Sequence, residues 1–122
     1  MDNSASSEQV DPVKTSDVRI VDEVMDDVKG RYGYSTLLAA TLCDDLLSRA
    51  EVGFKRYGTY LAPFNGRSNL LDAYQENLDL IKYLRNEIWE HPEDVDLKWH
   101  YHQMIDTCAF LCKRIHNLYE DK

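Results

Sequence analysis

The sequence has little that would suit a membrane, a secretory route or a β-sheet. No apolar run approaches the roughly 20 residues that a membrane-spanning helix needs. No apolar signal-peptide core follows the first residue. No segment of any length alternates apolar and polar residues as a strand does. We therefore expect an all-α protein that does not enter a membrane.

Cysteine and positive charge are also scarce. The three cysteines are an odd number in expected helices, which favours reduced thiols and a cytoplasmic location. Lysine and arginine number 14 against 22 aspartate and glutamate residues, so the formal net charge is -8. Because such a chain repels phosphate backbones, we expect no stable nucleic-acid binding. A local basic patch can still bind a small phosphate compound.

Several signatures of known chemistry are missing. There is no P-loop, no dinucleotide-binding fingerprint and no serine nucleophile elbow. Cys108, Cys112 and His116 share one helical face at spacings of four, but zinc needs a fourth ligand and tighter geometry than a straight stripe supplies. We interpret Cys108 as a core residue.

Four amphipathic segments predict four helices behind a polar tail. Residues 1–14 predict a disordered tail, and residues 15–122 a single helical domain. Apolar residues recur at spacings of three and four in the segments that follow this tail. The expected helices run from a cap at Thr15 or Ser16 to Gly30, from Ser35 to about Tyr57, from Ser68 or Asn69 to about Glu90, and onward from residues 92–94. The pattern predicts a four-helix bundle-like fold.

The fourth segment has a seam that suits packing along another helix. Its apolar residues, from Leu97 to Leu118, alternate spacings of four and three, as in coiled coils. Trp99 and Phe110 lie off this seam. Because one small bundle does not cover both faces, we expect a homo-oligomer through the fourth helix.

The stretch 56–67 holds more aromatic and basic residues than a helical connector needs. Gly58 is a natural helix stop, and Asn65-Gly66 tolerates positive φ. Such a loop either packs Tyr60 and Phe64 onto the bundle or completes a ligand site. We favour the ligand site, which would bind a nucleotide or a related phosphate-bearing small molecule. The expected ligand-binding residues are Lys55, Arg56, Tyr57, Tyr60, Asn65, Arg67 and Tyr83.

Carboxylates lie on both sides of this loop. Glu76 and Asp79 are one turn apart on the third expected helix, and Glu51 lies on the second. Antiparallel helices joined near residue 60 would bring Glu51 and Glu76 to a similar depth. Mg²⁺ or Mn²⁺ prefers such oxygen ligands and keeps sites for water and phosphate. We expect Glu51, Glu76 and Asp79 to be metal ligands and catalytic residues; the alternative is that they only solvate two helix faces.

Part of the chain resembles a known group of proteins. The runs DLLSRAEVGFKRYGTYL (45–61), NGR (65–67) and DAYQENLDLIKYLR (72–85) resemble small phage-encoded helical proteins, which are similar to all-α MazG-like nucleoside triphosphate pyrophosphohydrolases. The resemblance covers about residues 36–90. It implies Mg²⁺-dependent cleavage of nucleotides to monophosphate and pyrophosphate, with Glu76 and Asp79 as the family's E-x-x-D pair. The family's first acidic motif is not intact, and Glu51 with Asp44 stands in its place.

Three functions remain open from the sequence. The first is Mg²⁺-dependent nucleotide pyrophosphohydrolysis, and the second is a non-catalytic phage protein that sequesters a cyclic or other signalling nucleotide to counter host defence. The third is a helical protein-interaction module. The expected location is cytoplasmic, which is the host cytoplasm if the protein is phage-encoded.

Overall fold

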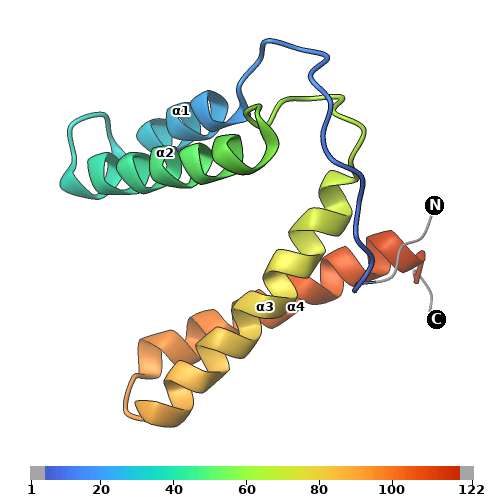
Figure 1. The fold of residues 1–122 in the computed structure, drawn as a ribbon. Helices are drawn as coiled ribbons and strands as arrows, with labels where there is room; N and C mark the ends of the chain where they lie inside the picture. Colours follow the sequence, from blue (N-terminus) through green and yellow to red (C-terminus); the bar gives the residue numbers. More distant parts are fainter. Residues whose placement is uncertain (1–4, 119–122) are drawn as a thin grey trace. The chain divides into compact units, whose positions relative to one another are not determined.

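The fold is all-α, and residues 5–118 form four helices, as the sequence predicts (Figure 1). The computed structural model describes residues 5–118, which contain no strand. The helices are α1 (Ile20–Tyr32), α2 (Leu37–Tyr57), α3 (Asn69–Glu90) and α4 (Val95–His116). Within residues 5–118, no helix combines the length and apolar character that crossing a bilayer requires. The predicted all-α, bundle-like fold class is confirmed.

The chain divides into two compact units. One unit is Gln9–Arg67, which contains α1 and α2. The other unit combines Met1–Glu8 with Ser68–Lys122 and contains α3 and α4. The single helical domain expected over residues 15–122 stays a prediction.

In the first unit, α1 and α2 pack side by side as a helical hairpin (Figure 1). Ala39 and Cys43 of α2 are buried, with 1% and 6% of their surface exposed. Val24, Met25 and Val28 of α1 are half-buried on the apolar face that their spacing predicts. The hairpin core is therefore built from small α2 residues under an α1 face of valines and methionine.

The start of α1 differs from the prediction. Neither Thr15 nor Ser16 caps the helix, which begins at Ile20 without a side-chain cap. The Thr15 hydroxyl donates to the carbonyl of Phe64, and the Ser16 hydroxyl accepts a hydrogen bond from the Val18 amide. The Ile20 amide, which a cap would otherwise satisfy, donates to the Leu61 carbonyl at 2.9 Å. Long-range partners thus replace the local cap.

The predicted ends of the first two helices have mixed outcomes. Gly30 does not end α1, which continues to Tyr32 and stops at Gly33. The cap of α2 is Thr36 rather than Ser35, and its hydroxyl accepts from the Ala39 amide at 3.2 Å. The predicted end at Tyr57 is confirmed, because Gly58 takes the left-handed conformation and its amide donates to Phe54.

In the second unit, α3 and α4 pack as another helical hairpin (Figure 1). The Ser68 hydroxyl caps α3 by accepting from the Leu71 amide, and α3 ends at Glu90, as expected. Helix α4 begins at Val95 after an Asp94 cap, so residues 92–94 form a turn rather than the first turn of the helix. The hairpin core contains four buried residues, Leu71, Ile88, Cys108 and Leu111.

The seam of α4 lies partly within this hairpin. Cys108 and Leu111 are buried, while Leu97, Tyr101, Met104 and Ile115 are half-buried. Trp99 and Phe110, which lie off the seam, are 60% and 54% exposed. The seam thus has a partner in α3, and the exposed aromatic side chains remain for any further contact.

The predicted disordered tail, residues 1–14, lies partly outside the described residues, because description begins at Ala5. Residues 5–14 contain neither helix nor strand. In the α3–α4 unit, the side-chain amide of Gln75 donates to the carbonyls of Ala5 and Ser7, each at 2.9 Å. Part of this segment therefore has specific hydrogen-bond partners.

Candidate functional site

The connection after α2 is held by an extended segment that precedes α1. We define residues 58–67 as the loop and residues 10–19 as the strap. The Val13 amide donates to the carbonyl of Asn65 at 2.9 Å, and the Thr15 hydroxyl donates to that of Phe64 at 2.6 Å. These contacts lie within the α1–α2 unit and run antiparallel along the two segments. They give the loop a fixed partner over much of its length.

Two guanidinium groups surround the ring of Tyr57. The centre of the Arg56 guanidinium lies 5.0 Å from the ring centroid, and that of Arg67 lies 5.6 Å away. Both distances are within the range of cation–π attraction. Arg67 also donates from Nη1 to the carbonyl of Val10 at 2.7 Å. The end of α2 and the end of the loop thus bring two cations to one aromatic ring.

Asn65 lies buried inside the loop, with 3% of its surface exposed. Its Oδ1 accepts a hydrogen bond from the amide of Arg67, which ties the two predicted ligand residues together. Its Nδ2 has no hydrogen-bond partner within residues 5–118. Phe64 and Gly66 on either side have positive φ values of 59° and 86°. The loop therefore turns sharply around a buried amide.

Tyr60 takes part in a network rather than standing open at the surface. Its ring centroid lies 4.6 Å from that of Phe54, and the Arg19 guanidinium lies 4.0 Å from the Tyr60 ring. Its hydroxyl donates to Oε2 of Glu51 at 2.5 Å. This hydrogen bond is the largest cause that raises the pKa of Tyr60 above 10.0; burial and the Glu51 charge add to it, and Arg19 opposes it.

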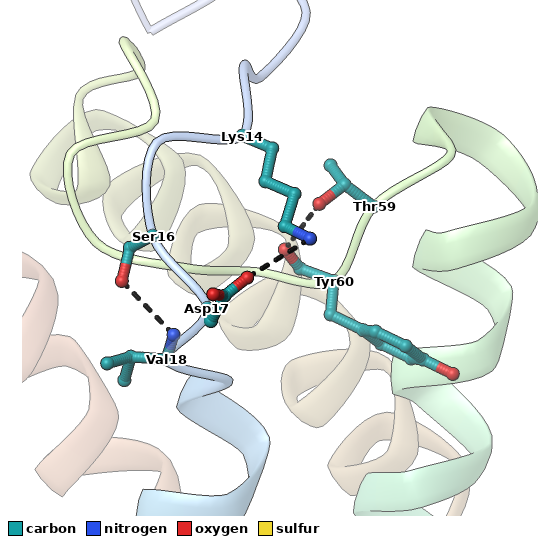
Figure 2. A network of polar contacts seen from close by, with 6 residues as sticks. All are labelled: Lys14, Ser16, Asp17, Val18, Thr59 and Tyr60. Carbon is teal, nitrogen blue, oxygen red and sulfur yellow. Dashed lines mark hydrogen bonds and ion pairs between the residues drawn. The ribbon is translucent and has the colours of Figure 1, made fainter.

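Figure 2 shows the strap beside the first residues of the loop. Lys14 and Asp17 of the strap form an ion pair of 3.2 Å, next to Thr59 and Tyr60. Within the loop, the Thr59 hydroxyl donates to the Tyr60 carbonyl at 3.3 Å. The Lys14–Asp17 pair is well exposed and adds little to stability. Hydrogen bonds to the loop backbone and the contact of Arg19 with the Tyr60 ring link the strap to the loop.

In the α3–α4 unit, Glu76 and Asp79 lie one turn apart on α3, and both are exposed. Asp79 forms an ion pair with Lys82 at 3.3 Å. A cavity of about 510 Å³ borders both carboxylates. Its other lining residues are Ala5, Ser6, Gln75, Leu78 and Lys82.

The predicted three-carboxylate metal site draws on both units. Glu51 belongs to the α1–α2 unit, whereas Glu76 and Asp79 belong to the α3–α4 unit. The joint site of these three acids therefore stays a prediction. Of the other predicted ligand residues, Lys55 is exposed in the last turn of α2, and Tyr83 is 72% exposed on α3.

Two features of the structure were not predicted from the sequence. The first is the pairing of Thr15 and Arg19 with the loop, for which no local sequence signal exists. The second is a group formed by Glu87, Glu90 and His91, whose potential ligand atoms lie within 4.8 Å of one another. Its spacing of three and four at the end of α3 could have been read from the sequence. All three residues are exposed, and an acidic group of this kind is common without a metal.

Comparisons with protein-family models, curated proteins and solved structures found no match for this chain.

Proposed function

We propose that this protein binds a nucleotide or a related phosphate-bearing small molecule at the end of α2 and the loop. The observation that carries the proposal is the pair of guanidinium groups, from Arg56 and Arg67, around the Tyr57 ring. Guanidinium groups bind phosphate oxygens in a fixed fork and also stack on flat rings. Two such groups near one ring form a local basic site in a chain whose net charge is -8. Lys55 and Tyr60 lie close in sequence, and Tyr83 is a further candidate ligand residue on α3.

The activity that we propose for this site is Mg²⁺-dependent pyrophosphohydrolysis, which the resemblance to MazG-like enzymes implies. Glu76 and Asp79 are exposed and one turn apart, and Mg²⁺ commonly takes one or two carboxylates together with phosphates and waters. Their donor type therefore fits Mg²⁺ or Mn²⁺, with Glu51 as a further ligand. The ion would neutralise charge on the phosphate groups. A nucleoside triphosphate and one water would give a monophosphate and pyrophosphate.

Different residues of the chain would bind the metal ion, activate the water and stabilise the phosphate charge. Glu76, Asp79 and Glu51 would hold the ion, and one carboxylate would orient the attacking water and accept its proton. Lys55 and Arg67 would stabilise the charge that develops on the phosphate oxygens.

A second candidate function is binding without turnover, as in a phage protein that sequesters a signalling nucleotide to counter host defence. Two of the three acids already have partners in the protein: Glu51 accepts from Tyr60, and Asp79 pairs with Lys82. Acids with protein partners have less need of a metal to offset their charge. This observation favours a binding protein in which the basic loop, rather than the carboxylates, recognises the ligand.

A thermal-shift screen of nucleoside di- and triphosphates and cyclic nucleotides, with Mg²⁺ and with EDTA, tests both candidates. A ligand that binds the folded state raises its melting temperature by mass action. We expect stabilisation of the parent protein and a smaller stabilisation of Arg67→Ala, while Arg49→Ala, at an exposed position of α2, should keep the full effect. Stabilisation that is equal in the parent and in Arg67→Ala would contradict the proposed site.

Turnover decides between the two candidates. Pyrophosphate release that depends on Mg²⁺ or Mn²⁺ and disappears in Glu76→Gln supports the enzyme, with Glu23→Gln on α1 as the control. Tight binding that persists in EDTA and in Glu76→Gln, without pyrophosphate release, supports the binding protein.

We also propose a homo-oligomer through α4, which the exposed Trp99 and Phe110 favour. The same surface is the basis for the third candidate, a helical protein-interaction module. The location that we propose is cytoplasmic, in the host cytoplasm if the protein is phage-encoded. Sedimentation of the parent and of Trp99→Ala at micromolar concentration tests the oligomer; a compact monomer for the parent would contradict it.

A further inference from the structure

The first residue of the strap, Val10, contacts one of the arginines of the proposed ligand site. The Val10 carbonyl accepts the 2.7 Å hydrogen bond from Arg67 Nη1. The two residues are 57 positions apart in the sequence, so this contact exists only when the strap lies on the loop. Arginine has a long side chain with many rotamers, and holding it in one of them favours binding by removing part of the ordering cost.

The contact orients Arg67 without neutralising it. A backbone carbonyl carries no net charge, so this hydrogen bond itself brings no negative charge to the guanidinium next to the Tyr57 ring. A strap that blocked the site would instead place a carboxylate on the guanidinium, as a competitor for phosphate. The observed chemistry therefore suits a strap that positions Arg67.

The strap is attached by contacts that are individually weak. Val10 and Val13 are 68% and 55% exposed, so little apolar surface is buried there. Other links are the hydrogen bonds from Val13 and Thr15 to loop carbonyls and the cation–π contact of Arg19 with Tyr60, each of modest net value. A segment with few buried apolar contacts opens at low free-energy cost. Its docking can therefore respond to a ligand.

We propose that the strap positions Arg67 for the phosphate-bearing ligand, and that ligand binding in turn holds the strap on the loop. This inference rests on the proposed function, because it concerns the regulation of the same site. The two effects are reciprocal: if docking raises the affinity for the ligand, the ligand stabilises docking by the same factor.

Thr15 offers a matched pair of variants away from the ligand residues. Thr15→Val keeps the shape of the side chain but cannot donate to the carbonyls of Phe64 and Pro63, whereas Thr15→Ser keeps the hydroxyl. Calorimetric titration with ATP and with inorganic pyrophosphate, in EDTA to prevent turnover, measures the dissociation constant. We expect Thr15→Val to weaken binding about three- to tenfold, as one net hydrogen bond would, and Thr15→Ser to bind within about twofold of the parent.

A double-mutant cycle shows whether the strap acts through Arg67. In an Arg67→Ala background, Thr15→Val should cause no further loss of affinity, because the side chain that the strap positions is absent. An equal loss in both backgrounds would mean that Thr15 only supports the fold, and it would overturn the inference.

Trypsin cleavage after Lys14 tests the reciprocal effect on the unmodified full-length chain. ATP or pyrophosphate should slow cleavage at Lys14 in the parent and leave it unchanged in Arg67→Ala. If the parent binds either compound but Lys14 is cleaved at the same rate, or if Thr15→Val binds as tightly as the parent, the inference alone fails. If the parent binds neither of these compounds and no nucleotide of the thermal-shift screen, the proposed function fails, and the inference fails with it.

Discussion

The hydroxyl of Tyr60 lies 2.5 Å from Oε2 of Glu51, and this hydrogen bond joins the loop to the helix that precedes it. The Tyr60 ring also contacts Phe54 and the guanidinium of Arg19. The predicted metal ligand Glu51 is therefore the acceptor of a charge-assisted hydrogen bond. A ligand that binds Oε2 of Glu51 has to share that oxygen with the Tyr60 hydroxyl.

The Tyr60–Glu51 bond predicts a specific pH dependence of stability. Because the pKa of Tyr60 is raised above 10.0, the folded state holds the tyrosine proton more tightly than the unfolded state. The resulting stabilisation is fully present below pH 10 and is lost as the pH rises through the folded-state pKa. We expect Tyr60→Phe to be less stable than the parent in urea near neutral pH, with a difference that narrows above pH 10. Tyr83→Phe, at an exposed site, should show no such trend, and a parallel trend in both variants would contradict the assignment.

Two glycines predict opposite effects of the same substitution. Gly58 has φ of 74° at the end of α2, where a side chain is strained, so Gly58→Ala should destabilise the protein by about 1–2 kcal/mol. Gly30 lies inside α1, and beyond its chain neighbours and the helix's own backbone nothing lies within 4 Å of an added Cβ. Gly30→Ala should therefore stabilise the protein by about 0.5–1 kcal/mol. Chemical denaturation of the two variants measures both values, and equal signs would refute this account of the helix ends.

Leu71 should carry much of the stability of the α3–α4 hairpin. It is 1% exposed, and truncation would leave a cavity, so Leu71→Ala should cost about 2–5 kcal/mol. Its neighbour Leu70 is 44% exposed and serves as the control; Leu70→Ala should cost less than about 1 kcal/mol. Urea denaturation monitored by circular dichroism compares the two, and similar losses would mean that the core lies elsewhere.

The cysteines should differ in reactivity. Burial is the main cause that raises the pKa of Cys108 above 9.0, and Cys112 one turn away contributes. Cys112 is half-buried, while Cys43 and Cys108 are buried. Since alkylation needs an accessible thiolate, iodoacetamide should label Cys112 at least about tenfold faster than Cys108 in the native protein. Mass spectrometry of timed samples gives the labelling rate of each cysteine. Equal labelling rates for Cys108 and Cys112 in the native protein would contradict the burial of Cys108.

Local sequence signals determined the number and type of the helices, the end of α2 and both ends of α3. Apolar spacing of three and four identifies the buried faces, and Ser68 and Gly58 act within one turn of their own positions. Such effects depend on the nearest residues alone. The sequence therefore predicts them without knowledge of the rest of the fold.

Tertiary structure decided the start of α1 and the partners of the loop. A cap at Thr15 is reasonable locally, but its hydroxyl finds the Phe64 carbonyl 49 residues away, and the amide of Ile20 finds Leu61. The same pairing brings Val10 to Arg67 and Arg19 to Tyr60. Contacts over such separations depend on where the α1–α2 hairpin returns the chain, and neither spacing nor side-chain type encodes that return locally. The loop backbone requires hydrogen-bond partners, and the strap supplies them because the fold brings it alongside the loop.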